Sequence, residues 1–352
     1  MPDVKANAAP TLVSGMRPTG RLHLGHMHGA LRNWVRLQDE YRTFYFVADW
    51  HALTTGYDKT EGILASTREM VTDWLAAGLD PKRSVIFRQS AVAEHAELFL
   101  LLAMITPTPW LLRNPSVKEQ ARELGLVASE DESEIAKINF GHLGYPVLQA
   151  ADILMYQARK VPVGLDQVPH IELTQEIARH FNNFYGNVFL EPEPLLSEAP
   201  KIAGLDGRKM SKSYNNAVFL SEPLKDVDAK LSRMMTDPRR ARRTDPGDPA
   251  DCPAYQSFHK IYCTPEELAY QEKGCKTASI GCLECKKIMI RHVLDDLKPI
   301  QERRSEIDAK PSIVADVLED GNRRARAVAE ETMEKVRAAV GLEPPTGGDA
   351  AS

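Results

Sequence analysis

The stretch Thr11–Gln38, TLVSGMRPTGRLHLGHMHGALRNWVRLQ, decides the fold. It opens with a short run rich in β-formers, continues through the turn-like MRPTG, and ends with apolar residues at helical spacing. A second strand-like run, TFYFVAD at 43–49, follows soon after. The order strand, turn, helix, strand predicts a parallel sheet, which binds ligands at the carboxyl ends of its strands.

The rest of the chain extends this pattern. SVIFRQS at 84–90 and VPVG at 161–164 are further candidate strands, and the region after 223 is helical except for a turn-rich, charged stretch at 236–285. We therefore predict an α/β protein, with a Rossmann-like doubly wound parallel sheet and a C-terminal mostly helical domain. The predicted division is a tail at 1–10, an α/β domain at 11–222 with a helical insertion at about 93–158, a helical domain at 223–342, and a tail at 343–352.

Composition is that of a globular protein large enough for two domains. The chain has 352 residues, 43% of them hydrophobic and 26% charged, with a net charge of −5. Its longest uncharged apolar stretch, 98–112, contains two prolines and is shorter than the ~20 residues of a membrane span. The N-terminus lacks the apolar core of a secretory signal, so we expect a cytoplasmic protein. Five cysteines without such a signal favour reduced, catalytic or metal-bound thiols.

The first chemical motif is His23-Leu24-Gly25-His26, placed where a strand and turn open a helix. Helix amides and two imidazoles would converge there on a triphosphate, and Gly25 would let the ligand approach the backbone. Taken alone, the motif is explained equally well by solvated histidines at 26 and 28 in a first helical turn.

The second motif is KMSKS, Lys209–Ser213, preceded by the glycine-containing run GLDGR. Two lysines three residues apart can hold ammonium groups against a pyrophosphate leaving group, where charge builds during nucleotidyl transfer. A lone lysine–serine loop is usually a solvated surface. Its combination with the histidine motif in one predicted domain favours a shared ATP site.

Together the two motifs resemble the HIGH and KMSKS signatures of class I aminoacyl-tRNA synthetases. The resemblance implies formation of an aminoacyl-adenylate from Mg-ATP and transfer of the acyl group to tRNA. It implies catalytic roles for His23, His26, Lys209 and Lys212. Arg17 departs from the Gln that related enzymes often carry, which puts its contact in doubt. The implied ATP-binding set is Arg17, Pro18, Thr19, Gly25, His26, Gly164, Leu165, Asp166, Ile202, Lys209, Met210, Ser211, Lys212 and Ser213.

Between the motifs, Tyr145, Gln149 and Asp152 fall at i, i+4 and i+7, on one face of a predicted helix. A carboxylate there can accept from an indole N–H or a phenol O–H, and Tyr and Gln can hold an α-ammonium group. The spacing does not separate tryptophan from tyrosine. It is also compatible with three polar residues that satisfy helix ends and neighbours.

The wider sequence narrows this choice. DWHALT at 49–54, AADILMY at 150–156 and VPVGLDQVPHIELT at 161–174 are similar to segments of tryptophanyl-tRNA synthetases, and the resemblance runs from about 12 to 342. It implies tryptophan, ATP and tRNA(Trp) as partners, and a homodimer. Leu165 departs from the Glu often found there, so the resemblance supports a backbone contact alone. The implied tryptophan-binding set is Tyr145, Gln149, Asp152, Gln167 and His51; a core position explains His51 nearly as well.

Four cysteines, Cys252, Cys275, Cys282 and Cys285, are spaced C-x22-C-x6-C-x2-C. Four thiolates suit tetrahedral zinc or an iron–sulfur cluster, and spacing alone does not decide between them or exclude metal-free thiols. A bacterial subset of tryptophanyl-tRNA synthetases resembles this sequence, including its TASIGC run, and binds a [4Fe-4S] cluster there. The resemblance therefore implies the cluster, in a structural role near the tRNA anticodon, with Cys263 a bystander.

A basic run between Arg233 and Arg243 adjoins the cysteines and suits a phosphate backbone, although such runs are as often merely solvated. Three rival functions remain at this level. A tyrosyl-tRNA synthetase shares the pocket spacing, a small-molecule nucleotidyltransferase shares the HxGH turn, and a paralogue could bind RNA or a partner without catalysis. The full KMSKS loop and the cysteine-bearing extension disfavour the second rival, and the intact histidines and lysines disfavour the third.

Overall fold

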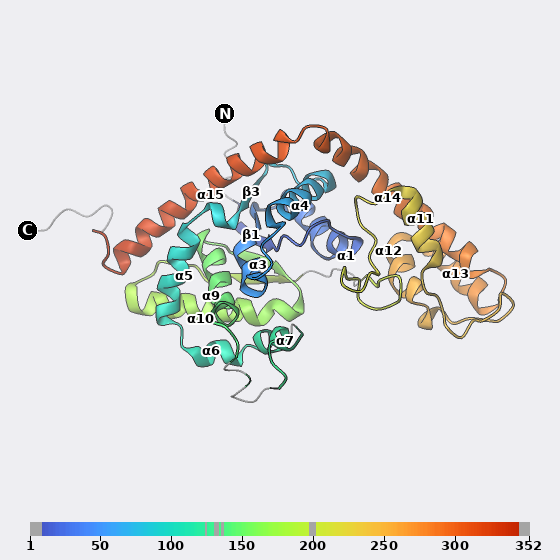
Figure 1. Cartoon of the computed structure of the whole chain (residues 1–352), viewed down its shortest axis with the longest axis horizontal. Helices are drawn as coiled ribbons and strands as arrows, with labels where there is room; N and C mark the ends of the chain where they lie inside the picture. Colours follow the sequence, from blue (N-terminus) through green and yellow to red (C-terminus); the bar gives the residue numbers. More distant parts are fainter. Residues whose placement is uncertain (1–8, 124, 130–133, 135–136, 197–201, 345–352) are drawn as a thin grey trace, which may run out of the picture.

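A five-stranded parallel sheet forms the centre of the computed structural model, which describes residues 9–123, 125–129, 134, 137–196 and 202–344 (Figure 1). Its strand order is β3-β2-β1-β4-β5. This confirms the predicted doubly wound α/β fold, and β5 is a strand that the sequence analysis did not predict. The strands are β1 Thr11–Met16, β2 Arg42–Val47, β3 Ser84–Arg88, β4 Lys160–Val163 and β5 Glu193–Leu196.

The strand order switches next to β1, because the chain adds β2 and β3 on one side of this strand and β4 and β5 on the other. β2 and β3 lie on one side of β1, with Thr11 opposite Arg42, whereas β4 pairs with its other side, with Leu12 opposite Lys160. In an open α/β sheet, the crevice beyond the carboxyl ends of the two strands at such a switch is where ligands bind. The residues that follow β1 and β4 are therefore the first candidates for a site.

Both faces of the sheet are covered by helices, as expected of parallel strands. Neighbouring residues Leu12 and Val13 of β1 belong to different hydrophobic clusters, and so do Tyr45 and Phe44 of β2. This alternation follows from the two-residue period of a strand. The helices of this part of the chain are α2 Arg32–Leu37, α3 Asp49–Gly56, α4 Ile63–Ala77, α5 Glu94–Ile105, α6 Thr108–Arg113, α7 Pro115–Glu123, α9 Phe140–Met155 and α10 Val168–Tyr185, of which α6 and α7 pack against α9.

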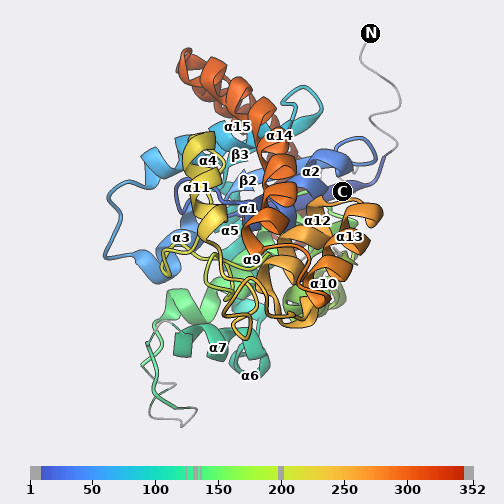
Figure 2. The same cartoon turned by 90° about the vertical axis from the view of Figure 1, so that its right-hand side faces the viewer.

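The C-terminal third is helical and extends from the sheet domain. α11 packs beside α14, and the two run side by side in Figure 2. The turn-rich stretch expected at 236–285 contains a full helix, α13, whose start is capped by Thr264 and Glu267. The elements are α11 Leu224–Arg233, η4 Pro249–Asp251, η5 Tyr255–His259, α12 Lys260–Tyr262, α13 Pro265–Lys276, α14 Cys282–Asp308 and α15 Ser312–Ala339.

The last helix, α15, returns to the sheet and lies along β3 (Figure 1). Its contact is close because Gly321 lacks a side chain: a Cβ there would lie 1.8 Å from the carbonyl oxygen of Ile86. Asn322 and Arg324 of α15 bind backbone groups of Arg88 and Pro81. The helix therefore closes one edge of the sheet.

Two further expectations concern the ends of elements. TFYFVAD does not stay extended to Asp49, because β2 ends at Val47 and Asp49 begins α3, which places His51 in a first helical turn rather than at a strand end. The expected tails at 1–10 and 343–352 fall mostly outside the described residues. Among the described helices, none combines the length and the apolar character needed to cross a membrane.

Candidate active site and cysteine pocket

The HLGH segment forms a tight turn at the start of α1 Leu24–His26. The backbone N–H of His23 donates to Nδ1 of His26 at 3.3 Å, and the two imidazole rings stack with centroids 3.7 Å apart. His23 and His28 are both buried. The solvated-histidine interpretation is therefore wrong for His28, which instead accepts or donates a hydrogen bond to the Tyr262 hydroxyl at 2.7 Å.

Gly25 also leaves room for the histidine stack. A Cβ at this position would lie 2.9 Å from the His23 ring, and its next neighbour would be the Met210 side chain at 3.7 Å. Glycine is thus required by the stacked histidines themselves. Any side chain here would displace the His23 ring from its stack.

The KMSKS region reaches the HLGH turn through a short antiparallel pairing. The N–H of Leu24 donates to the carbonyl of Val218, and the N–H of Leu220 donates to the carbonyl of Leu22, both at 2.9 Å. The segment that follows KMSKS is therefore fixed against the segment that contains HLGH. This pairing brings together two motifs that lie far apart in the chain.

Lys212 lies next to the histidines. Its Nζ donates to the carbonyl of Thr19 at 2.6 Å. Burial, the charge of His23 and the charge of Lys212 lower the pKa of His26 to about 3. Burial and Lys212 lower the pKa of His23 to about 4. Both imidazoles are therefore neutral near pH 7 and can donate to phosphate oxygens without adding to the local positive charge.

The other KMSKS residues divide between core and surface. Met210 is buried in the hydrophobic core beside the turn, whereas Lys209 is exposed on the strand-like bridge that it forms with Ala203. The hydroxyls of Ser211 and Ser213 hydrogen bond to each other at 2.8 Å. The loop thus presents its serines and Lys212 next to the HLGH turn.

Sequence reasoning missed the residue that shapes this loop. Oδ1 of Asn216 accepts the N–H of Ser211 at 2.8 Å, and its Nδ2 donates to Oδ1 of Asp206 at 2.7 Å. Asn216 is buried, and Gly204 leaves room for it, because a Cβ at Gly204 would lie 2.2 Å from the amide nitrogen. The signal was present in the sequence as Asn following a Gly-rich, Lys-rich loop, but a single Asn does not distinguish a loop anchor from a solvated residue.

Three residues of the predicted ATP-binding set, Gly164, Leu165 and Asp166, lie at the end of β4. Gly164 precedes the short helix η3 Leu165–Gln167, where Leu165 is exposed and the side chain of Gln167 donates to Asp166 at 2.9 Å. Ile202, by contrast, is buried in the core cluster that includes Met210. Arg17 and Pro18 follow β1, so these groups lie on both sides of the switch point.

Asp152 is the centre of a buried polar network on α9. It accepts hydrogen bonds from Nε2 of His51 at 2.8 Å, from Nδ1 of His95 at 2.6 Å and from Nε2 of Gln89 at 2.7 Å. Burial opposes the charged carboxylate, but the hydrogen bonds from His51 and His95 hold the pKa of Asp152 below its usual range. The site therefore contains a carboxylate whose two oxygens are held in place by buried donors.

Gln89 and His95 were missed by the sequence analysis. Gln89 follows β3 directly, so the rule that ligand-binding groups lie at the carboxyl ends of parallel strands could have found it. His95 is fully buried in the first turn of α5, and its Nε2 hydrogen bonds to the Tyr156 hydroxyl at 2.7 Å. Nothing in the local sequence distinguishes it from a core histidine.

Aromatic rings line the approach to Asp152. Tyr145 lies edge-on to His51 with centroids 6.5 Å apart, and its hydroxyl is 3.3 Å from Nε2 of His170. Burial raises the pKa of Tyr145 to about 12, against the opposing charge of Arg17. Gln149 is half-buried on the same helix. His51, Tyr145 and Asp152 thus converge as predicted, with His170 as an additional member.

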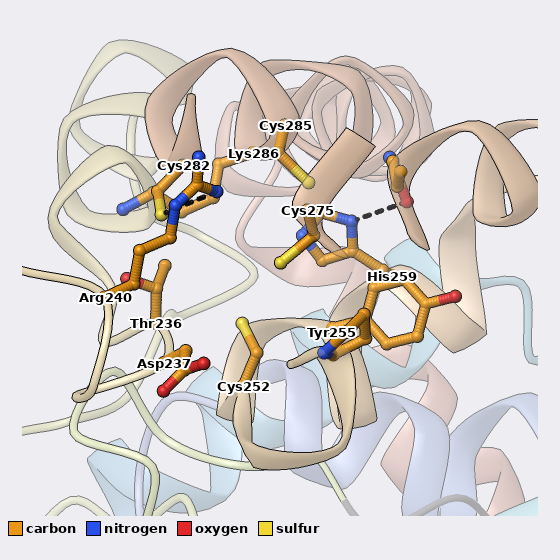
Figure 3. Close-up of a pocket in the computed structure, with 12 residues that line it drawn as sticks. Thr236, Asp237, Arg240, Cys252, Tyr255, His259, Cys275, Cys282, Cys285 and Lys286 are labelled. Carbon is orange, nitrogen blue, oxygen red and sulfur yellow. Dashed lines mark hydrogen bonds between the residues drawn. The ribbon is translucent and has the colours of Figure 1, made fainter. Parts of the chain in front are cut away.

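The four spaced cysteines line one pocket, together with Arg240, Tyr255, His259 and Lys286 (Figure 3). Burial, followed by the charges of Cys252, Cys275 and Cys282, raises the pKa of Cys285 to about 12. Among the described residues, however, no three His, Cys, Asp or Glu side chains form a group that could hold a metal ion. Cys263 lies outside this lining, 3.9 Å from Nδ1 of His259.

The basic run is less open to a nucleic acid than its sequence suggests. Arg240 is buried, its Nη2 donates to the carbonyl of Ile280 at 2.6 Å, and its Nη1 lies 3.7 Å from Sγ of Cys282. Arg239 forms ion pairs with Asp237, Asp248 and Asp251. Arg239, Arg242 and Arg243 are all exposed, and Arg243 pairs with Glu284.

The chain is similar to proteins of known activity over nearly its whole length. A family model described as class I tRNA synthetases for tryptophan and tyrosine matches residues 5–294. A tryptophan–tRNA ligase of Thermotoga maritima is 52% identical and covers 94% of this chain and 99% of its own. A tryptophan–tRNA ligase of Aquifex aeolicus is 46% identical with the same two coverages.

A solved structure agrees with these sequences. The tryptophanyl-tRNA synthetase from Campylobacter jejuni, crystallised with ADP and tryptophan, matches with a TM-score of 0.81 and 32% identity. The match covers 94% of this chain and all of that one.

Proposed function

The chain belongs to the class I tRNA synthetases for tryptophan and tyrosine, and from this membership we infer that it is a tryptophan–tRNA ligase. It activates tryptophan with ATP and transfers it to tRNA(Trp). The structural observation that best supports this function is the contact of Lys212 with Thr19, beside the stacked histidines. A flexible ammonium group and two neutral imidazoles there face one another at the start of a helix.

We propose that this arrangement stabilises the pyrophosphate as it leaves. Lys212 exchanges its bond with Thr19 for the β- and γ-phosphates, and Lys209 approaches from the exposed side of the loop. His23 and His26 donate hydrogen bonds to phosphate oxygens as neutral rings. Such donors stabilise the charge that develops in the transition state, and this stabilisation usually contributes more to catalysis than any other single effect. Mg²⁺ accompanies ATP as part of the substrate and shares in neutralising its charge.

Asp152 is proposed to read the indole N–H. Its two oxygens are already oriented by His51, His95 and Gln89, so the indole meets a fixed acceptor and adds a charge-assisted hydrogen bond. A substrate without a matching N–H would not form this hydrogen bond, and that difference favours tryptophan. Tyr145 and Gln167 are proposed to hold the α-ammonium group, and Gly164 to Asp166 the nucleoside of ATP.

The experiment that tests the function is ATP–pyrophosphate exchange driven separately by tryptophan and by tyrosine. We expect exchange with tryptophan and little with tyrosine. Faster exchange with tyrosine would reverse the choice of amino acid. Charging of total tRNA with radiolabelled tryptophan then tests the second half-reaction. Pyrophosphate exchange without charging would indicate a paralogue that activates tryptophan but no longer aminoacylates tRNA.

For the cysteine pocket we propose a [4Fe-4S] cluster rather than zinc. Four thiolates carry negative charge, and two buried cations, Arg240 and Lys286, lie in the same lining. Nε of Arg240 is buried without a hydrogen-bond partner, as expected of a donor that faces a missing anion. The donor set and its counter-charges therefore fit the group.

The preference for the cluster over zinc comes from the family resemblance, since four thiolates suit either group. If bound, the cluster would link the residue after η4, the end of α13 and the start of α14. It would have a structural role, without electron transfer in the reaction.

The remaining assignments are proposals that follow from the family. We propose that the helical region 223–342 binds the anticodon end of tRNA, with Arg242 and Arg243 toward its backbone, and that two chains form a homodimer. A cytoplasmic location is supported by the five free cysteines among the described residues, since reduced thiols are typical of that compartment. Sedimentation with and without tRNA tests both assemblies.

A further inference from the structure

A buried carboxylate joins three parts of the chain next to the HLGH turn. Asp73 of α4 is fully buried, and its Oδ2 accepts the backbone N–H of Leu22 at 2.8 Å. Its Oδ1 accepts a hydrogen bond from Nη1 of Arg304, near the end of α14. Arg304 also donates to Glu69 at 2.6 Å. Leu22 directly precedes His23, so this contact holds the backbone from which the histidine pair begins.

No described backbone carbonyl near Leu22 accepts its N–H in place of Asp73. The carbonyl of Leu22 is used by the N–H of Leu220, but the N–H of Leu22 points to the other side, toward α4. A buried N–H without an acceptor is destabilising. The position of Leu22 therefore depends on where the carboxylate of Asp73 lies, and that carboxylate is oriented by Arg304.

The same charge reaches the KMSKS loop. Burial lowers the pKa of Lys212, and the negative charge of Asp73 opposes that shift. Asp73 thus acts on both signatures, on HLGH through a hydrogen bond and on Lys212 through its field. Burial raises the pKa of Asp73 itself to about 6, with Arg304 and the N–H of Leu22 opposing, so loss of Arg304 would weaken its charged form.

Arg304 belongs to the helix that begins at the cysteine pocket. α14 carries Cys282 and Cys285 in its first turn and Arg304 in its last turns, roughly 33 Å apart at 1.5 Å per residue. A displacement of α14 would therefore be felt at Leu22 as a change in the Asp73–Arg304 pair. Helices transmit such displacements because they are stiff and have packed sides.

We propose that Asp73 and Arg304 are positioning residues for the reaction with ATP. They hold the HLGH turn in place against α14, and the charge of Asp73 sets the electrostatic potential at Lys212. The proposal rests on the proposed ATP site and deepens it. Neither residue touches the reacting atoms. They determine instead how closely His23, His26 and Lys212 match the phosphates.

The test compares Arg304→Met with a matched neighbour, Arg303→Met. Arg303 joins the same two helices, because its Nε donates to the carbonyl of Ala76 in α4 at 2.6 Å, but it does not contact Asp73 or Leu22. We expect Arg304→Met to reduce kcat/KM for ATP in pyrophosphate exchange by about 10- to 100-fold, the scale of a small misplacement of reacting groups. The dissociation constant of tryptophan should change less than about 2-fold, whereas Arg303→Met should leave both near wild type.

Two further variants separate positioning from stability. Asp73→Asn keeps an oxygen for the N–H of Leu22 but removes the charge, and Arg304→Lys keeps a charge without the fork that reaches both acids. We expect Asp73→Asn to lower kcat/KM for ATP as Arg304→Met does. Arg304→Lys should have a smaller defect than Arg304→Met. If Arg304→Met does not fold, Asp73→Asn decides the question at a temperature where unfolding measurements show it to be native.

Equal losses in Arg304→Met and Arg303→Met, in proportion to their loss of stability, would overturn the proposal. So would wild-type ATP kinetics in Asp73→Asn. Failure of the underlying function is visible separately, because the wild-type protein would then show no tryptophan-dependent exchange. The deciding measurement is thus the loss in kcat/KM for ATP compared with the change in the dissociation constant of tryptophan.

Discussion

Lys212 and Thr19 are separated by 193 positions in the chain, yet Nζ of Lys212 lies 2.6 Å from the carbonyl oxygen of Thr19. The bond is a resting contact between a loop and a turn that ATP would replace on binding. In the proposed function, this contact keeps the ammonium group near the phosphates of ATP, and rotation about the side-chain torsions of Lys212 would bring the group to them.

Removal of the ammonium group should slow adenylate formation. For Lys212→Met we expect kcat of tryptophan-dependent pyrophosphate exchange to fall by about 10²- to 10³-fold, as for the loss of one preorganised donor in a transition state. Tryptophan affinity, measured by fluorescence titration without ATP, should stay within about 2-fold. Lys225→Met, an exposed lysine of α11, is the matched control and should retain full exchange. A Lys212→Met enzyme as fast as this control would refute the role.

Asp152 should decide tryptophan recognition. In Asp152→Asn the acceptor loses its charge and presents an amide N–H to its histidine neighbours, so we expect KM for tryptophan to rise by about 10- to 100-fold, the range of a charge-assisted hydrogen bond. Tyr156→Phe removes the hydroxyl behind His95 but leaves the carboxylate, and its effect should be several-fold smaller. Steady-state exchange at varied tryptophan measures both. Similar KM values in the two variants would show that Asp152 is structural.

The free energy of unfolding should fall in mild acid, and His28 isolates one contribution. Burial and the charge of Arg32 lower the pKa of His28 to about 4, with Asp296 opposing. Above pH 6.5 this ring is neutral whether the chain is folded or not. Between pH 6.5 and 4 the unfolded chain binds a proton that the folded chain does not, so stability is lost as the pH drops.

The measurement is urea unfolding at pH 7.5 and pH 5 for the wild type and His28→Gln. The variant should lose about 2 kcal/mol less than the wild type over this interval, because it lacks one titrating ring. Asp73, with its pKa raised to about 6, gains stability as the pH falls through that value, but it does so equally in both proteins. Parallel pH profiles would mean that His28 is accessible to protons in the folded state.

The cysteine pocket predicts a coloured protein. Purified without oxygen, the chain should be brown and contain about four irons and four sulfides. Cys285→Ser should lose the colour and lower the melting temperature, because metal binding to a folded site adds to folding free energy. Cys263→Ser, outside the pocket lining, should keep both. Stoichiometric zinc without visible absorbance would exclude the cluster.

Much of the fold and of the catalytic turn could be predicted because their signals are local. The alternation of Leu12 and Val13 follows from the period of a strand, and the spacing of Tyr145 and Asp152 follows from the period of a helix. The class of the sheet then followed from the order of the elements. The proximity of Lys212 to the HLGH turn could be predicted because the KMSKS motif is specific in itself.

The missed residues are those that depend on partners remote in sequence. Asn216 is informative only once its bonds to Ser211 and Asp206 are known, and His95 only once it lies against Asp152. Arg240 was counted as surface charge because a run of arginines does not reveal which one turns inward. Such roles are set by tertiary packing, which local propensity does not encode.

The close approach of Gly321 to Ile86 has a consequence for solubility. A strand at the end of a parallel sheet normally offers a row of unpaired amides and carbonyls to any passing β-segment. Here α15 covers that row along β3, so two folded chains cannot join edge to edge at this side. A bulky residue in place of Gly321 would lift the helix and expose the strand, and aggregation rather than loss of catalysis would be its first sign.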